Sequence, residues 1–538
     1  MSQTLDQIFL STAQKKPDAI ALTTGPESAR LGLESSREIS YQNAALYINE
    51  ISAFLRAFGF KEGDIILTQL PNIVETPLLL LGIMNAGLIP CLTPSQWRRQ
   101  ELEAALKTIT PSAAIIHPST PTSTPFDSIF EIAAQEMSLR FIFGLGNNLP
   151  DGVTPLKTLS PVISNNHATH NGEIVANEAP LFRRSGEQVA AIGWSHDPQG
   201  QPKPVAYTHI QLMANGYMLT ERQGLEASPN ILSSYNTTSL PGLIAAFIPW
   251  ITEAGHLHLT TNLKIDDLSA AIAEHNINLA ILPQGVKKAL EGTIAPHTHL
   301  ALVATSPARP QAKQENQDAA STISHLYNIN GLTMVTSTNE PGNGLLKLGP
   351  QEDTNGNTPN PPFIETRLQG ATQKAAEDGD VMKGRLELSG TAVGFTDWHN
   401  AITTSPLSNF DQHWEKTALT GRLVDNEMTW LEIETASDIL YHGNHALNGP
   451  ELDTLYQAYP GFIDAAAFSI KDPIMGERLF AAIIPRPGDS LSYEDFKNHL
   501  LAQQVSPAKI PEKLVTVTEI PRDKQGLIAR SEILRPTN

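Results

Sequence analysis

The chain has 538 residues, of which 41% are hydrophobic and 17% charged, and this composition excludes a largely disordered protein. One hydrophobic core rarely serves so long a chain, so several compact units are expected. The formal net charge of −19 repels phosphate backbones and argues against general nucleic-acid binding.

The N-terminus and the apolar segments predict a cytoplasmic protein without a membrane span. Residues 1–6 contain neither a basic region nor an apolar run. The longest apolar stretch, residues 77–90, is shorter than the ~20 residues that a membrane helix needs. The single cysteine, Cys91, lies in an apolar run and is expected to be a small buried side chain.

Helix and strand signals alternate from the start of the chain. Apolar residues at helical spacing predict a helix at 5–15 that ends before Pro17, and Ser40 can cap a helix that runs to Phe58. The other elements expected are strands at 19–23, 64–70, 88–92, 279–282, 301–304 and 323–327, helices at 75–86, 268–275 and 284–290, and loops at 119–126 and 353–362. This alternation is typical of βαβ units, so the fold class is α/β with mostly parallel sheets.

A compact C-terminal unit is expected after Ala436. Its predicted elements are helices at 450–458 and 493–503 and strands at 465–470, 479–484 and 513–517. These elements suffice for a small α+β domain. We therefore expect two domains, residues 1–435 and residues 436–538.

Several segments resemble the motifs of the adenylate-forming enzymes, the AMP-dependent synthetase and ligase family that includes the AMP-forming acyl-CoA synthetases. Their order and spacing along almost the whole chain are similar to those of the family. The matching segments are Ile39-Ser40-Tyr41, Gly200-Gln201-Pro202-Lys203 with Thr208-His209, Gly331-Leu332-Thr333, Thr420-Gly421, Ala436-Ser437-Asp438-Ile439, Gly449-Pro450-Glu451-Leu452-Asp453, Asp472-Pro473 with Gly476-Glu477, and Ile520-Pro521 with Gly526.

The resemblance implies a large N-terminal domain that holds ATP and a carboxylate, and a small mobile C-terminal domain that rotates between two half-reactions. The first half-reaction makes an acyl-adenylate, and the second transfers the acyl group to CoA or a carrier thiol. By position, the nucleotide-binding residues are Ser195, Gly200, Lys203, Gly331, Thr333, Met334 and Arg422. Ser239 falls in the acyl pocket and Asp438 at the hinge between the domains.

The phosphate loop departs from the family pattern of small hydroxyl and glycine residues. Here it reads Ser195-His196-Asp197-Pro198-Gln199-Gly200. Pro198 removes a backbone N–H donor, and the Asp197 carboxylate repels a phosphate. The loop is therefore interpreted either as a weakened phosphate site, in which Ser195, Gly200 and Lys203 keep the family chemistry, or as a simple surface turn.

Three further positions lack the family's functional groups. Met334 replaces a glutamate that serves Mg²⁺, and its soft thioether is a poor ligand for a hard cation, so apolar packing is expected. Arg422 replaces the aspartate that accepts hydrogen bonds from the ribose hydroxyls. A guanidinium has no acceptor atom, so it cannot make these hydrogen bonds. Leu527 replaces the family's catalytic lysine, with Lys524 nearby as a weak substitute. No other metal site is expected.

Three hypotheses follow. The first is a homologue with lost or strongly reduced adenylation that binds an acyl group, an acyl thioester, a nucleotide or a partner enzyme. The second is a divergent but active ligase that uses ATP and Mg²⁺ to activate a carboxylic acid for transfer to CoA or an acyl carrier protein. The third is acyl transfer without ATP on the same fold.

Overall fold

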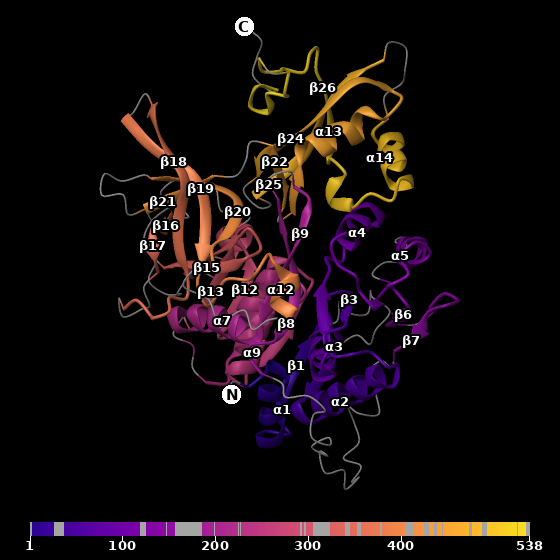
Figure 1. Ribbon diagram of the computed structural model, residues 1–538, viewed down its shortest axis with the longest axis vertical. Coiled ribbons are helices and arrows are strands. Elements are labelled where there is room, and N and C mark those ends of the chain that lie inside the picture. Colours follow the sequence, from indigo (N-terminus) through magenta and orange to yellow (C-terminus); the bar gives the residue numbers. More distant parts are fainter. Residues whose placement is uncertain are drawn as a thin grey trace.

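The computed structural model describes residues 3–25, 37–118, 125–146, 148–156, 185–197, 200–223, 225, 227–290, 293–294, 297–304, 323–338, 345–351, 357–376, 379–403, 413–423, 430–434, 438–443, 445–472, 476–486, 492–524 and 526–533. Its N-terminal part is built on two large sheets of mostly parallel strands (Figure 1). The eight-stranded sheet has the order β15 (Thr333–Thr338), β14 (Ile323–Ile329), β13 (His299–Val303), β12 (Leu279–Pro283), β10 (Asn230–Ser233), β11 (His256–Leu259), β1 (Ile20–Thr24) and β2 (Arg37–Ser40). The seven-stranded sheet has the order β7 (Thr154–Pro155), β6 (Phe141–Gly144), β5 (Ala113–Ile116), β3 (Ile65–Gln69), β4 (Ile89–Leu92), β8 (Val189–His196) and β9 (Pro202–Thr208).

Helices connect and cover these strands, as the α/β fold class predicts. In chain order they are α1 (Leu5–Lys15), α2 (Tyr41–Ala57), α3 (Glu75–Asn85), α4 (Arg99–Leu106), α5 (Pro125–Ala133), α7 (His209–Gln223), α8 (Leu240–Gly242), α9 (Ile248–Thr252), α10 (Ile265–Glu274), α11 (Lys287–Leu290) and α12 (Trp398–Thr403). The Ser40 hydroxyl caps α2 by accepting a hydrogen bond from the backbone N–H of Asn43 at 3.2 Å.

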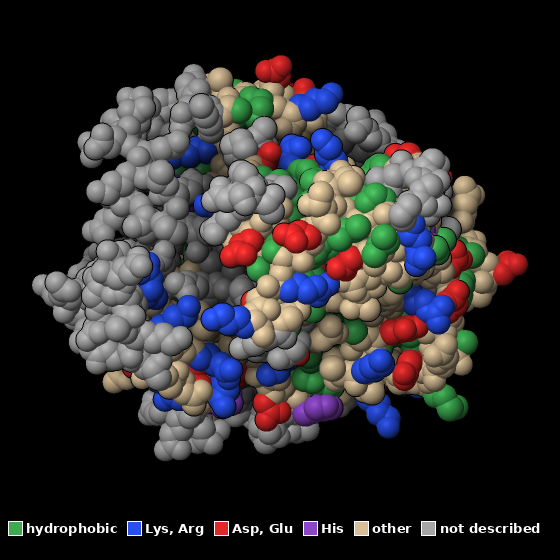
Figure 2. Space-filling model, turned by 90° about the horizontal axis from the view of Figure 1, so that it is seen from above, with side chains coloured by type: hydrophobic (Ala, Val, Ile, Leu, Met, Phe, Trp, Pro, Cys, Tyr) green, Lys and Arg blue, Asp and Glu red, His purple; other side chains and the backbone are tan. Residues whose placement is uncertain are grey.

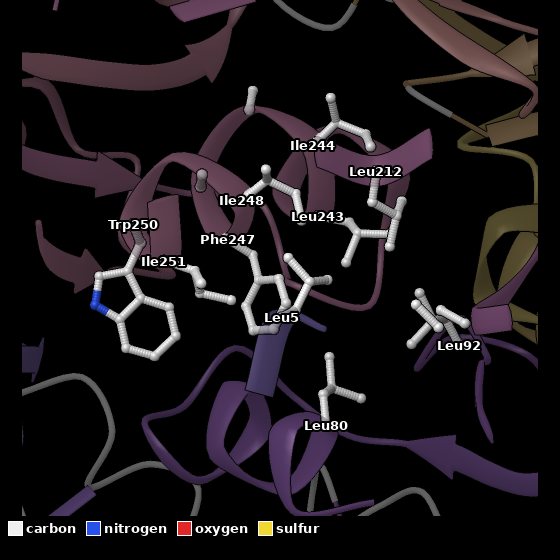
Figure 3. Close-up of a cluster of buried hydrophobic side chains, with 14 of the residues drawn as sticks. Leu5, Leu80, Leu92, Leu212, Leu243, Ile244, Phe247, Ile248, Trp250 and Ile251 are labelled. Atoms are coloured by element: carbon white, nitrogen blue, oxygen red, sulfur yellow. The ribbon is translucent and has the colours of Figure 1, made fainter. Parts of the chain in front are cut away.

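The main hydrophobic core lies between the two sheets and draws on α1, α3 and the segment from α8 to α9 (Figure 3). A π-helical turn, Leu243–Phe247, joins α8 to α9 within this core. Phe247 and Trp250 are fully buried, and the Trp250 indole N–H donates to the carbonyl of Ala21 on β1 at 2.9 Å. The indole N–H therefore has a hydrogen-bond partner inside an apolar core.

A third sheet in the N-terminal part is antiparallel and was not predicted from the sequence. Its order is β16 (Leu345–Lys347), β21 (Trp430–Glu434), β20 (Glu415–Leu423), β19 (Gly379–Ser389), β18 (Glu365–Ala376) and β17 (Gly349–Pro350). Residues on β20 alternate between buried and more accessible positions, which is the burial pattern of a sheet with one face covered.

The C-terminal unit has its own core and lies at the top of the view in Figure 1. It contains the hairpin β22 (Ile439–His442) and β23 (His445–Asn448), the sheet β24 (Phe462–Asp472), β25 (Gly476–Pro485) and β26 (Lys513–Thr516), helices α13 (Gly449–Gln457) and α14 (Tyr493–Ala502), and the 3-10 turn Pro507–Lys509. Arg530 joins the end of this unit to α13, because its guanidinium donates to both carboxylate oxygens of Asp453, at 3.0 and 2.6 Å.

Most of the expected elements are present, with small differences at their ends. The strand expected at 19–23 is β1, Ile20–Thr24. The helix expected at 284–290 is a 3-10 turn, Gln284–Val286, followed by α11. The loop predicted at 119–126 extends two residues too far, because α5 already begins at Pro125.

Parts of three predictions lie outside the described residues. These are residues 119–124 and 353–356 of the two predicted loops, and residues 435–437 around the predicted boundary between the domains. The boundary at 435/436 therefore stays a prediction. The family-like split into a large and a small unit agrees with the separate cores.

Two observations concern possible membrane spans among the described helices and the charge on the face seen from above. None of the helices in the described ranges is long and apolar enough to cross a bilayer. Figure 2 shows Asp and Glu side chains interspersed with Lys and Arg on that face.

Candidate active site

A cavity of about 790 Å³ lies between the N-terminal part and the C-terminal unit. Its walls come from the loops that follow β4 and β10, from α4, from the turn between β8 and β9, from the turn between β14 and β15, and from the hairpin β22–β23. Ligands of open α/β folds bind at the carboxyl ends of the strands, and the β4 and β10 loops leave from those ends. The cavity is therefore the candidate active site.

In the turn that corresponds to the family's phosphate loop, Asp197 accepts hydrogen bonds from two backbone N–H groups of the same turn. The N–H of Gly200 donates to the carbonyl of Asp197 at 2.9 Å, and the N–H of Gln201 donates to the Asp197 carboxylate at 2.8 Å. Gly200 has a φ of +76° and lines the cavity against Asn448 of the C-terminal unit. Pro198 lies outside the described residues. The Asp197 carboxylate thus stays at the cavity wall as part of a hairpin turn.

Ser195 and Lys203, which flank this turn, do not line the cavity along the described residues. Ser195 is 1% exposed, and its hydroxyl donates to the carbonyl of Lys203 on the neighbouring strand at 3.3 Å. Lys203 itself is exposed on β9. Their proposed contact with phosphate stays a prediction.

The turn between β14 and β15 brings Gly331 to the cavity. Gly331 has a φ of +72°, which an L side chain rarely adopts. The Asn328 side chain accepts a hydrogen bond from the N–H of Gly331 at 2.8 Å, and the Tyr207 hydroxyl donates to its carbonyl. These contacts hold the turn against β8 and β9.

Thr333 and Met334 follow this turn but lie inside the protein. The Asn215 amide on α7 donates to the Thr333 hydroxyl at 2.8 Å and to the Met334 carbonyl at 3.0 Å. Met334 is fully buried in the main core. The thioether packs apolarly, as the sequence predicted, and at this depth it offers nothing to Mg²⁺ in the cavity.

The remaining predicted site residues are spread over three places. Ser239 lines the cavity and caps α8, because its hydroxyl accepts from the N–H of Gly242 at 3.3 Å and donates to the Asn236 carbonyl at 2.6 Å. Arg422 is half-buried on β20, next to Glu432 in the register of β21, and is not among the described cavity residues. Asp438 lies 3.8 Å from Arg530 Nε and its carbonyl accepts from the N–H of Gly449.

Leu527 lies on a loop that is closed upon the C-terminal unit's own surface. Its N–H donates to the Asp523 carboxylate at 2.9 Å, and Arg522 of the same loop pairs with Asp464 at 2.9 Å. The Leu527 side chain is 55% exposed and is not among the described residues that line the cavity.

The charges on the cavity wall fit a polyphosphate poorly. Among the described lining residues, the carboxylates are Glu101, Asp197 and Glu451, and the ammonium is Lys509. Lys509 already pairs with Glu101 at 2.7 Å and with Glu451 at 2.5 Å. ATP would add negative charge to a wall that is already negative. The described lining of the cavity therefore does not fit bound Mg·ATP.

Two partly buried imidazoles, His196 and His445, also line the cavity. Burial lowers the pKa of His196, although Asp197 opposes this effect. Burial, followed by His442 and His196, lowers the pKa of His445 to about 4. Both rings are neutral near pH 7 and add no positive charge to the site.

Sequence reasoning missed the residues that the C-terminal unit and α4 bring to the cavity. These include Trp97, Glu101, Tyr441, His445, Asn448 and Lys509. Asn448 caps α13 by accepting from the N–H of Glu451 at 2.7 Å, so its polar cap signal was visible in the sequence. Its place at the cavity depends on the packing of distant segments, and no local pattern encodes that.

The partly buried His445 predicts that stability falls in acid. An unfolded histidine titrates near 6.5, so both states are neutral above that pH and His445 contributes nothing. As the pH falls from 6.5 to about 4, the His445 ring is protonated in the unfolded chain but stays neutral in the folded chain. The free energy of unfolding therefore drops by up to roughly 3 kcal/mol. Below that range both states are protonated and the loss stops growing.

Urea unfolding at pH 7.5 and pH 4.5 checks this prediction. We expect His445→Gln to reduce the acid loss relative to the parent, whereas the exposed His297→Gln should leave it unchanged. An identical acid loss in the parent and His445→Gln would contradict the assignment.

The fold and the cavity define a two-part α/β protein of the adenylate-forming class, and comparison with known proteins agrees. The profile of the family described as AMP-binding enzyme matches residues 9–393, which is more than half of the chain, and the chain belongs to this family. It is 22% identical to a 2-hydroxy-7-methoxy-5-methyl-1-naphthoate–CoA ligase of Streptomyces carzinostaticus, over 97% of this chain and 91% of the relative. It is also 22% identical to a sulfoacetate–CoA ligase of Cupriavidus necator, over 94% of both chains.

Solved structures share the fold at low sequence identity. The o-succinylbenzoate CoA synthetase of Bacillus subtilis superimposes with a TM-score of 0.68 and 15% identity, over 100% of this chain and 99% of that one. The amide bond synthetase of Marinactinospora thermotolerans gives a TM-score of 0.69 and 14% identity, over 99% of both chains. The predicted fold class and family are confirmed.

Proposed function

We propose that this chain is a member of the AMP-binding enzyme family that binds an acyl group or acyl thioester in its cavity and has lost efficient adenylation. The observation that carries the proposal is Leu527, an exposed apolar side chain at the position of the family's catalytic lysine. Removing one preorganised electrostatic group typically lowers a rate ~10²–10³-fold. The buried Met334 and the carboxylates of the cavity wall support the same conclusion.

The alternative is a divergent but active ligase. It is supported by the full-length similarity to CoA ligases, whose substrates are carboxylic acids. Such an enzyme would transfer the acyl group to CoA or an acyl carrier protein, and Mg²⁺ would be held by phosphates and water without the Met334 position. A cytoplasmic location and a paired enzyme as partner remain part of the main proposal.

Pyrophosphate release from Mg·ATP separates the two functions. The full chain would be assayed with a panel of carboxylic acids that includes salicylate, malonate and sulfoacetate, the acids named for its relatives. A sulfoacetate–CoA ligase serves as the parallel positive control. We expect the chain to release pyrophosphate at least ~10²-fold more slowly than the control with its own substrate.

Calorimetric titration completes the test. The proposal expects acyl-CoA to bind and Mg·ATP to give no saturable heat. Tight Mg·ATP binding together with rapid, acid-dependent pyrophosphate release would overturn it in favour of the active ligase.

A further inference from the structure

Lys509 makes a charged contact between the two parts of the chain. It ends the 3-10 turn Pro507–Lys509 of the C-terminal unit. Its ammonium lies 2.7 Å from a carboxylate oxygen of Glu101 on α4 and 2.5 Å from one of Glu451 on α13. The side chains of Lys509 and Glu101 are 9% and 10% exposed, so this contact is well shielded from water.

This three-residue cluster, called here the Lys509 clamp, is held from both sides. On α4, the second Glu101 carboxylate oxygen accepts from the N–H of Arg98 at 2.9 Å, which fixes the side chain as part of a capping box. In the C-terminal unit, the Tyr456 hydroxyl donates to the Lys509 carbonyl at 2.7 Å. The ammonium is therefore presented to Glu101 by rigid elements.

The electrostatics of the clamp favour one arrangement of the two parts. Burial alone would lower the pKa of Lys509, but Glu101 and Glu451 outweigh burial and raise it, so the ammonium stays charged. Without that ammonium, the buried Glu101 carboxylate would lie near the partly exposed Glu451 carboxylate, and the two would repel. Figure 1 shows α4 directly beneath the C-terminal unit, where this contact is made.

The clamp also determines one wall of the cavity. The His442 ring of the hairpin β22–β23 contacts the carbonyl of Ala508 at 2.8 Å, immediately before Lys509. The same hairpin places His445 and Asn448 on the cavity, with Asn448 against Gly200 of the N-terminal part. A shift at Lys509 would therefore move the hairpin away from the β8–β9 turn.

We propose that Lys509 is a positioning residue that joins Glu101 to Glu451 and so keeps the C-terminal unit in the orientation that completes the cavity. A second contact at the same boundary, from the Ser128 hydroxyl to the Gln504 side chain at 3.2 Å, is uncharged. The clamp is therefore the contact whose loss should free the C-terminal unit. This inference concerns the arrangement of the chain and holds for either function considered above.

The test measures the distance between spin labels on the two parts of the full-length protein. Leu46→Cys on α2 and Leu501→Cys on α14 place one label on an exposed helical position in each part. In Figure 1, α2 lies in the lower part of the view and α14 in the upper part. The native Cys91 is fully buried, and the unsubstituted chain checks that it takes up no label. The parent is expected to give one narrow distance distribution by pulsed electron resonance.

Four substitutions are then compared in this labelled background. Lys509→Met removes the charge, and Glu101→Gln removes one carboxylate while it keeps the capping hydrogen bond. Both should broaden the distribution and move at least half of the population outside the parental peak. Lys509→Arg, which can still join two carboxylates, should retain the narrow peak, and so should the exposed control Lys513→Met.

Circular dichroism decides whether each variant is folded. If Lys509→Met proves unfolded, Glu101→Gln carries the test, because it alters only the partner on α4. A parental distribution in folded Lys509→Met, or in Glu101→Gln when Lys509→Met is unfolded, would overturn the proposal. Broadening in both with rescue by Lys509→Arg would establish it.

Discussion

Glu75→Ala is expected to lower the free energy of unfolding of the N-terminal part by about 3–5 kcal/mol. Glu75 opens α3 and is 0% exposed, and it accepts a hydrogen bond from the guanidinium of Arg37 on β2, which is 8% exposed. The substitution leaves the buried guanidinium without this carboxylate. Urea denaturation followed by circular dichroism, with the N-terminal transition analysed separately, measures the loss.

Two further variants show whether the loss comes from a buried charge. Glu38→Ala removes an exposed carboxylate one residue from Arg37 and should change stability by less than about 0.5 kcal/mol. The double variant Arg37→Met, Glu75→Leu removes both charges and should be more stable than Glu75→Ala. A loss below about 1 kcal/mol in Glu75→Ala would show that the pair is dispensable.

The elements that the sequence predicted well are those whose signals are local. The helix at 5–15 carries apolar residues on one face and ends before Pro17, and the structure has the same bounds, Leu5–Lys15. Ser40 was expected to cap the next helix and does so. Met334 was expected to pack apolarly because its thioether is a poor ligand for Mg²⁺, and the side chain is fully buried.

The features that the sequence could not predict depend on pairs of distant segments. The antiparallel sheet of β16 to β21 joins strands from residue 345 to residue 434, and its partners are chosen by packing and register rather than by local periodicity. The pair Arg37–Glu75 and the Lys509 clamp each unite charges that look solvated when they are read along the chain. Charged residues are rarely buried unless they are paired, so only the fold reveals them.

The candidate site shows the same division between sequence and structure. Position along the family motifs identified Gly200, Gly331 and Ser239, which line the cavity, but also Ser195, Thr333 and Met334, which face into the protein. A motif fixes which strand end or turn a residue occupies. It does not fix whether the side chain reaches the cavity, because that depends on which distant segments pack against it.

Gly331→Ala is expected to cost roughly 4 kcal/mol or more and to distort the cavity. A Cβ on Gly331 would lie 2.2 Å from the carbonyl oxygen of Trp194 and 3.0 Å from Cα of Ser195. These are backbone atoms of β8, so the strand or the turn must move, and both line the site. The positive φ of +72° adds strain of about 1–2 kcal/mol for an L side chain.

Gly526→Ala is the matched control, because Gly526 has a φ of +82° but no atom within 4 Å of an added Cβ. It should show the conformational strain alone, so the difference between the two variants measures the steric clash. Thermal unfolding compares their stability, and titration with acyl-CoA compares their binding. Equal losses of stability and of acyl-CoA binding in the two variants would mean that the β14–β15 turn can shift to accommodate a Cβ at little cost. A much larger loss in Gly331→Ala would show that the close approach of this turn to β8 holds the cavity in shape.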